Sequence, residues 1–431
     1  MTITPPMAPA QAQGIAASLD LRALPADFYN NPYPVYAWLR EHEPVRRMPD
    51  GSYFLTRYAD LVAVYRDAQS FSSDKKVEFT PKYNHGPYGS GDDAPLLVHH
   101  TTSLVFNDPP LHTRVRKLIM GALTRRAIAD MEPGLITLVD GLLDAMAARG
   151  GGDLIEDFAS AIPVEIIGNL LGVPHAYRAP LRDWSLAILG ALEPKLTPEQ
   201  EALGNQSVSD FTAYLRELVR DRRAHPGDPE HDVLTRLIQG ESAGDTLSET
   251  ELLQNCVFIL NAGHETTTNL IGNALVALQE WPDEKARLLQ RMAAAPDAAA
   301  LEAVMTLAVD EFLRFESSNQ LGNRRAVKAC EVGGVPLEPG ALVTLCIGAA
   351  NRDPAQFAHP DVLDLSRENN RHLAFGFGIH QCAGLSLARL EGRIAIGRFL
   401  QRFPAYRLTA SPQRGGRARF RGFLHAPFST A

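Results

Sequence analysis

The 431-residue sequence lacks the features of a membrane protein, a secreted protein or a nucleic-acid-binding protein. No stretch reaches the roughly 18 to 20 uninterrupted apolar residues of a membrane-spanning helix. The N-terminus has neither the basic start nor the continuous apolar run of a secretory signal. The formal net charge of −8 disfavours binding to nucleic acid. We therefore expect a cytoplasmic protein that has neither a membrane nor a nucleic-acid partner.

Cysteine is also scarce, and the four residues are Cys256, Cys330, Cys346 and Cys382. No two of them have the C-x-x-C spacing that is typical of zinc sites and redox dithiols. Four thiols cannot cross-link a chain of this length, but they suit a reducing compartment, in which a single functional thiolate persists.

Helical periodicity dominates the pattern of apolar residues. Thr197–Gln200 and Ser248–Glu251 have the sequence of capping boxes, which open helices. The second box begins a run that ends only at Trp281–Pro282, which predicts a helix roughly 50 Å long that crosses the molecule. Further helices are expected over 33–43, 59–69, most of 109–282, 301–315 and about 382–403, and short strands over 52–58 and 325–345.

This pattern predicts one large, mainly α domain with a small β region, of the α+β class. No internal repeat or linker divides residues 19–431. Residues 1–18 are rich in Pro, Ala and Gln and are expected to be a disordered lead-in. Residues 70–108 are rich in Gly, Pro, His and Asp and are expected to form a long loop, either simply solvated or gating a substrate.

The most specific segment is the run from Phe375 to Gly384, which reads FGFGIHQCAG. It resembles the signature of the cytochrome P450 family, F-x-x-G-x-x-x-C-x-G, with a histidine two residues before the cysteine. The resemblance implies haem b (iron protoporphyrin IX) with Cys382 as the axial thiolate ligand. The remaining cofactor-binding residues that it implies in this segment are Phe375, Gly376, His380 and Gly384.

The residue types in this segment suit such a ligand. Gly376 and Gly378 permit turns that other residues avoid, and Gly384 allows close approach to a flat macrocycle. Cys382 is expected at the start of a helix, where unpaired N–H groups stabilise a thiolate. The other three cysteines are interpreted as buried, inert thiols.

The middle of the long predicted helix reads Ala262-Gly263-His264-Glu265-Thr266. It is similar to the A-G-x-[ED]-T segment of the same family. The small side chains of Ala262 and Gly263 would leave room for the cofactor and dioxygen, and the Thr266 hydroxyl can bond to the carbonyl of Ala262. The resemblance implies that Thr266 steadies the activated oxygen and that Glu265 helps to deliver protons. Asn261, just before this segment, is expected to add a polar group near the haem.

The E-x-x-R pattern of the family is present as Glu311 and Arg314, which lie three residues apart and can pair on one helix face. The resemblance implies an internal ion pair that braces the region of the cysteine loop, so its role is structural. Relatives commonly carry a proline shortly after this helix, whereas this chain has Ser317-Ser318-Asn319. Phe258, Leu321 and Phe423 are candidates for the substrate pocket, or are plain core residues.

A haem carries two propionates, which need cationic or hydrogen-bonding partners. Residues 108–116 resemble the family's D-P-P-x-H-x-x-x-R helix start, in which His112 and Arg116 face the same way. Arg324 is aligned with a third propionate ligand, although the adjacent Arg325 leaves the register open by one residue. His380 is the fourth residue that the resemblance assigns to the propionates.

The resemblance implies a monooxygenase that inserts one atom of dioxygen into a small to medium apolar organic molecule. The chain has no flavin or iron–sulfur motif, so NAD(P)H would act indirectly, through a ferredoxin and its reductase. Two alternatives stay open, a peroxygenase driven by hydrogen peroxide and a haem-thiolate protein that only binds ligands. The retained Glu265 and Thr266 argue against both. A docking patch for the ferredoxin is expected from Arg371, Arg389, Arg393 and the Arg125–Arg126 pair, unless these are merely solvated charges.

Overall fold

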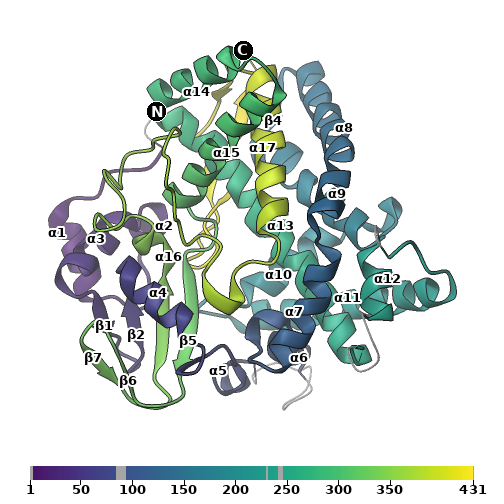
Figure 1. The fold of residues 1–431 in the computed structure, drawn as a ribbon. Helices are drawn as coiled ribbons and strands as arrows, with labels where there is room; N and C mark the ends of the chain where they lie inside the picture. The colour runs from purple at the N-terminus through teal and green to yellow at the C-terminus, as the bar shows by residue number, and fades with distance from the viewer. Residues whose placement is uncertain (1–2, 84–93, 230–231, 241–245, 431) are drawn as a thin grey trace. The chain divides into compact units, whose positions relative to one another are not determined.

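The computed structural model describes residues 3–83, 94–229, 232–240 and 246–430 (Figure 1). They group into two compact units. Unit 1 comprises residues 1–72, 134–162 and 266–431, and unit 2 comprises residues 73–133 and 163–265. Three helices run from one unit into the other: α8 (Arg125–Arg149), α9 (Ala161–Leu170) and α13 (Glu249–Glu280). That residues 19–431 form a single domain stays a prediction.

Every strand of the described chain belongs to unit 1. The main sheet has the order β1-β2-β8-β5-β3, in which only the β2–β8 pair is parallel. Its strands are β1 (Val45–Arg47), β2 (Tyr53–Leu55), β8 (Leu342–Cys346), β5 (Leu321–Ala326) and β3 (Phe71–Ser72). The smaller sheets pair β4 (Gly151–Asp153) and β9 (Arg407–Leu408) with β12 (Pro427–Ser429), β6 (Cys330–Val332) with β7 (Val335–Leu337), and β10 (Gln413–Arg414) with β11 (Phe423–His425).

Helix α4 (Tyr58–Arg66) covers the main sheet of unit 1. Leu61 and Val64, on its apolar face, are buried in one cluster with Val343 and Leu345 of β8. The other helices of this unit are α1 (Pro9–Ala17), α2 (Ala26–Asn30), α3 (Tyr33–His42), α14 (Pro282–Ala294), α15 (Ala298–Phe315), α16 (Ile347–Ala350) and α17 (Leu385–Arg402), with a π-helical turn at Leu154–Ala159.

The regular secondary structure of unit 2 is entirely helical in its described residues. Besides its parts of α8, α9 and α13, it contains α5 (Lys76–Lys82), α6 (Pro95–Thr102), α7 (Leu111–Ala122), α10 (Leu181–Gly190), α11 (Pro198–Ala224) and α12 (Val233–Gln239). Both predicted capping boxes are confirmed. Thr197 and Gln200 bond reciprocally at the start of α11, and Ser248 and Glu251 do so at the start of α13.

Two segments that were not predicted to be helical contain helices in the structure. The expected disordered lead-in contains helix α1, because Ala12 and Ala16 are buried against the core that α3 also lines. The expected long loop over 70–108 contains α5 and α6, apart from residues 84–93, which lie outside the described residues. Helix α6 is held by the backbone N–H of Leu96, which donates to the Asn205 side chain of α11 at 2.9 Å. No helix of the described residues combines the length and the apolarity needed to cross a bilayer.

Candidate functional site

The cysteine loop of unit 1 is closed by backbone hydrogen bonds. The N–H of Cys382 donates to the carbonyl of Phe375 at 2.9 Å, and the N–H of Gly376 donates to Leu373 at 2.8 Å. Gly376 and Gly378 have φ values of +64° and +73°, in the left-handed region that favours glycine. A Cβ on Gly378 would lie 2.3 Å from the carbonyl oxygen of Tyr65. Glycine is therefore required at 378 both by its backbone and by its packing on α4.

Cys382 lies just before helix α17, which begins at Leu385 with Gly384 as its N-cap. The predicted helix thus starts three residues later than expected, because the loop continues through Gly384. A Cβ placed on Gly384 would meet no atom of the described chain within 4 Å, so this side of the helix start is open for a flat group. Cys382 itself is partly exposed.

Two of the other cysteines are suited only to packing. Cys256 on α13 and Cys346 on β8 are fully buried, and burial raises the pKa of each thiol to about 12. Both thiols are therefore protonated at neutral pH and are poor metal ligands. The interpretation of Cys256 and Cys346 as inert is consistent with this environment. The predicted burial of Cys330 is wrong, because this residue of β6 is only partly buried.

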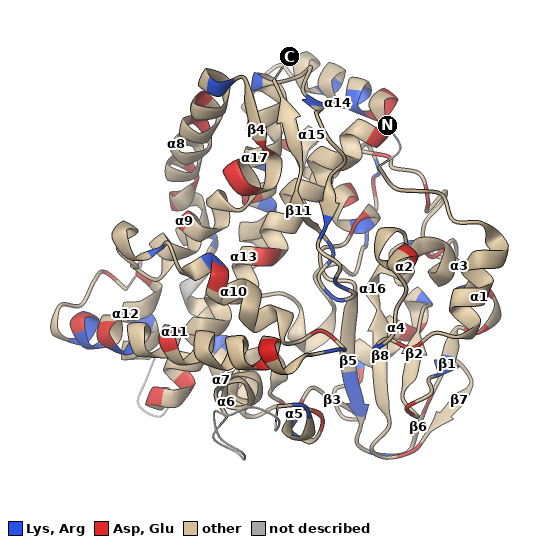
Figure 2. Cartoon of the chain, turned by 180° about the vertical axis from the view of Figure 1, so that it is seen from behind, with Lys and Arg blue, Asp and Glu red and all other residues tan. Residues whose placement is uncertain are grey.

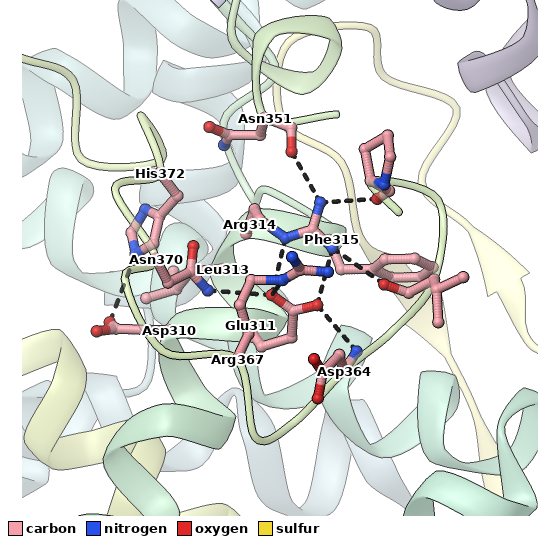
Figure 3. Close-up of polar contacts among 12 residues, drawn as sticks. Asp310, Glu311, Leu313, Arg314, Phe315, Asn351, Asp364, Arg367, Asn370 and His372 are labelled. Carbon is pink, nitrogen blue, oxygen red and sulfur yellow. Dashed lines mark hydrogen bonds and ion pairs between the residues drawn. The ribbon is translucent and has the colours of Figure 1, made fainter. Parts of the chain in front are cut away.

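The predicted ion pair between Glu311 and Arg314 is confirmed as a buried, bidentate interaction (Figure 3). Arg314 Nε and Nη2 donate to the two carboxylate oxygens of Glu311, each at 2.8 Å. Neither side chain is exposed to solvent. Three further groups donate to the Glu311 carboxylate, namely Arg367 Nε at 3.0 Å, Asn370 Nδ2 at 3.0 Å and the backbone N–H of Asp364 at 2.9 Å.

This ion pair is linked to the cysteine loop through Asn351. Arg314 Nη1 donates to the carbonyl of Asn351 at 2.9 Å, and the Asn351 side chain accepts from the N–H of Leu373 at 2.6 Å. The carbonyl of Leu373 is the acceptor of the Gly376 N–H at the base of the loop. The pair therefore braces the segment from Asp364 to Gly376 and, through it, the cysteine loop.

A second contact to the loop was not predicted from the sequence. Arg389, on α17, donates to Asp310 at 2.7 Å and places its guanidinium 4.9 Å from the ring centre of Phe375. Burial raises the pKa of Asp310, but hydrogen bonds from His372 and Arg389 outweigh it, and the net pKa is lowered. The aspartate is therefore ionised and fixes the cation over Phe375.

Strand β5 carries the adjacent Arg324 and Arg325, which form its blue stretch in Figure 2. Successive side chains of a strand point to opposite faces. The guanidinium of Arg324 lies 5.3 Å from the ring centre of Tyr65, whose carbonyl packs against Gly378 of the cysteine loop. Arg325 is paired in register with Ser72 of β3. The contact with Tyr65 places Arg324 on the side of the cysteine loop and favours it over Arg325 as the predicted propionate ligand.

The first two predicted propionate residues lie in unit 2, on α7. His112 is buried in the first turn of the helix, and Arg116, one turn later, is partly buried. The helix is fixed by Arg114, which forms an ion pair with Glu251 and donates to the carbonyl of Thr246 at 2.9 Å. The structure thus holds His112 and Arg116 on one helix, while Arg324 and His380 belong to unit 1.

The predicted oxygen-side segment lies within α13, which is continuous from Glu249 to Glu280. Glu265 is buried, and Thr266 and Ala262 are partly buried. A Cβ on Gly263 would lie 1.9 Å from the Ile167 side chain of α9. Any side chain at 263 would therefore require the end of the Ile167 side chain to move, so Gly263 permits close packing of α13 on α9. Its assignment to the cofactor, like that of Ala262, stays a prediction.

Glu391 is a buried acid that the sequence did not single out, because a glutamate in a helix usually faces solvent. It lies on α17, nine residues after Cys382, and shares a hydrogen bond with Thr267 of α13. Burial raises the pKa of Glu391 to about 8, although the bond to Thr267 opposes the shift. This carboxyl is therefore mostly protonated at neutral pH.

The expected basic docking patch is largely paired with acids. Arg389 pairs with Asp310, and Arg393 with Glu302. In unit 2, Arg126 lies 3.9 Å from Asp130. Arg371 is exposed, and its backbone carbonyl accepts from the Tyr58 hydroxyl at 2.8 Å. Much of the positive charge in this region is thus neutralised locally.

Comparison with known proteins agrees with these features. The family model for cytochrome P450 matches residues 187–414. The chain is 37% identical to cytochrome P450 107B1 of Saccharopolyspora erythraea, over 91% of this chain and 93% of the relative. It is 36% identical to cytochrome P450 monooxygenase PikC of Streptomyces venezuelae, over 93% of this chain and 91% of the relative.

Among solved structures, it is similar to P450BioI in complex with an acyl carrier protein ligated to hexadec-9Z-enoic acid. The TM-score is 0.84 and the identity 32%, with coverage of 94% of this chain and 99% of that chain. The fold is thus that of a mainly helical haem enzyme with small sheets. The chain belongs to the cytochrome P450 family and is a haem-thiolate monooxygenase that acts on an organic substrate.

Proposed function

We propose that Cys382 is the axial ligand of the haem and that the enzyme inserts oxygen into a small to medium apolar molecule. The observation that carries this proposal is the geometry of the cysteine loop. Gly378 packs against Tyr65, the N–H of Cys382 is bonded to Phe375, and a buried ion pair braces the chain leading into the loop. Such a loop holds one sulfur atom in a fixed position.

The surrounding residues fit a haem. Gly384 presents an open face beside the cysteine, and Phe375 offers an aromatic ring at the start of the loop. When bound, the haem supplies the iron at which dioxygen is activated, and a thiolate ligand favours cleavage of the O–O bond. In unit 1, Arg324 and His380 are the proposed donors to the propionates, and in unit 2 they are His112 and Arg116.

On α13, Glu265 and Thr266 are proposed to move protons to the reacting oxygen. Glu265 is buried, so its carboxyl exchanges protons in a water-poor environment, and the Thr266 hydroxyl can both donate and accept. The pair is therefore proposed to act in proton transfer.

Thr266→Ala is expected to uncouple the reaction. With a substrate, a ferredoxin and its reductase, product formed per NAD(P)H consumed should fall about 10-fold, and hydrogen peroxide should rise to match, because one proton donor is lost. Thr267→Ala is the matched control, because the Thr267 hydroxyl is directed to Glu391 on α17. Unchanged product yield in Thr266→Ala would contradict the assigned role.

The electrons are proposed to come from a ferredoxin and its reductase, in the cytoplasm. Arg371 is the proposed contact, because it is exposed and lies two residues before Leu373, whose carbonyl accepts from the N–H of Gly376 in the cysteine loop. The nearby Arg389 and Arg393 are engaged by Asp310 and Glu302. We therefore propose a small docking site in place of a broad basic patch.

Turnover with ferredoxin is expected to weaken about 3-fold to 10-fold between low and 0.3 M salt, because exposed charges are screened. Arg371→Glu should raise the KM for ferredoxin by about the same factor and leave kcat near its original value. Arg22→Glu changes the net charge equally on an exposed arginine of the N-terminal region and serves as the control. Turnover that is independent of salt would exclude this docking site.

A further inference from the structure

Helix α13 buries three side-chain amides within unit 2, and one of them differs from the other two. They are Gln254, Asn255 and Asn261, which are at most 6% exposed. Gln254 bonds to the His99 ring at 3.0 Å, and Asn255 accepts from the N–H of Leu104 at 2.9 Å. Asn261 has no hydrogen-bond partner at either Oδ1 or Nδ2 among the described residues.

The amide of Asn261 also does not bond to its own helix. Asn255 Nδ2 donates to the carbonyl of Glu251, one turn back, at 2.8 Å, which shows that an asparagine of this helix can satisfy itself locally. Asn261 is equally buried, at 1% exposure, and makes no such bond. A buried amide without a partner costs stability, so such groups usually serve a ligand or an ordered water.

The position of Asn261 on the helix indicates that its amide serves a ligand and not an ordered water. At about 100° per residue, Asn261 lies on the same face as Gln254, seven residues earlier, and Glu265, four residues later. Gly263, which packs against Ile167 of α9, lies on the opposite face. At the Gln254 end, this face is covered by the segment of α6, through His99. At its other end is the proposed proton-transfer acid, Glu265.

We infer that the side-chain amide of Asn261 recognises a hydroxyl or keto oxygen of the substrate. This inference rests on the proposed function, because it assigns Asn261 to the face of α13 that carries Glu265. The amide both donates and accepts, so it can pair with either oxygen. The substrate class is thus narrowed to an apolar carbon skeleton that carries at least one oxygen function at a distance from the carbon that is oxidised.

The test uses the haem-containing full-length enzyme and 1-alkylimidazoles with chains of four to twelve carbons, each with and without a terminal hydroxyl. The imidazole nitrogen binds the iron, so the chain length scans the distance to position 261. Dissociation constants are read from the shift of the haem Soret band. We expect the terminal hydroxyl to tighten binding about 10-fold at the one or two chain lengths that place it at Asn261. At the other lengths the hydroxyl should weaken binding, because it loses its hydrogen bonds to water without gaining a partner.

Asn261→Leu should abolish this length-dependent preference and leave binding of the plain alkylimidazoles within about 2-fold. Its thermal midpoint should be equal to or above that of the original enzyme, because an unsatisfied amide is removed. Asn255→Leu is the matched control, which should lower the midpoint and retain the preference. If that variant does not fold, Cys256→Ala on the same helix replaces it.

Two outcomes would overturn the inference. One is that the hydroxyl improves binding at no chain length, which would assign Asn261 to an ordered water. The other is that Asn261→Leu keeps the preference. The carbon-monoxide spectrum of each reduced preparation is recorded first. A missing thiolate band in the original enzyme would refute the proposed haem site, whereas a normal band with no preference refutes only the role of Asn261.

Discussion

Cys382→Ala is expected to remove the long-wavelength Soret band of the reduced carbon-monoxide adduct. That band reports a thiolate bound to the iron, and Cys382, in the loop between Phe375 and Gly384, is partly exposed. Without the sulfur, the loop has no side chain that donates comparable electron density. Monooxygenase turnover with a ferredoxin and reductase should fall by about 10³-fold or more, because the effect acts on the bond-breaking step itself.

The control variants for this experiment are Cys256→Ala and Cys346→Ala. Both thiols are fully buried, and burial raises the pKa of each to about 12, so neither can replace the missing ligand. Each control should keep the long-wavelength band and most of the turnover, with only a modest loss of stability from the smaller side chain. Retention of the band in Cys382→Ala, or its loss in Cys256→Ala, would refute the assignment of the ligand.

The parts of the structure that could be predicted from the sequence are those encoded by neighbouring residues. The two capping boxes satisfy N–H groups three residues away, so Thr197 and Ser248 marked the starts of α11 and α13 correctly. The Glu311–Arg314 pair is similarly local, because three residues separate the partners on one helix. In the cysteine loop, the left-handed backbone of Gly376 was visible as glycine in a turn.

The parts that could not be predicted depend on contacts between distant segments. Gly378 also has to accommodate the carbonyl of Tyr65, and nothing in the loop sequence indicates that neighbour. The contact of Arg324 with the same tyrosine favours it over Arg325, and the sequence alone gives no preference between the two. Helix α1 was taken for a disordered segment, because composition does not reveal that Ala12 and Ala16 are buried in a core made by later residues. Glu391 was missed because its burial depends on the packing of α17 on α13, where it bonds to Thr267.

Glu311→Gln is expected to lower the free energy of unfolding by about 3–5 kcal/mol, since it leaves the Arg314 guanidinium buried without a counter-charge. Arg367 and Asn370 also donate to Glu311, so one substitution weakens several bonds at once. The matched control is Glu302→Gln on the same helix, α15. Glu302 pairs with Arg393 and is 60% exposed, so its loss should cost less than about 1 kcal/mol. Urea unfolding of both variants measures the difference.

Glu311→Gln and its control Glu302→Gln also test whether the Glu311–Arg314 ion pair fixes the position of Cys382. In the structure, Arg314 holds the carbonyl of Asn351, Asn351 holds Leu373, and Leu373 accepts from Gly376 at the base of the loop. If this chain of bonds fixes the sulfur, Glu311→Gln should lose haem or convert part of its carbon-monoxide band to the shorter wavelength of a non-thiolate adduct, while it is still folded. A variant that loses stability but keeps a full long-wavelength band would show that the ion pair supports only the surrounding fold, and that the loop is held by Gly378 and Arg389 without it.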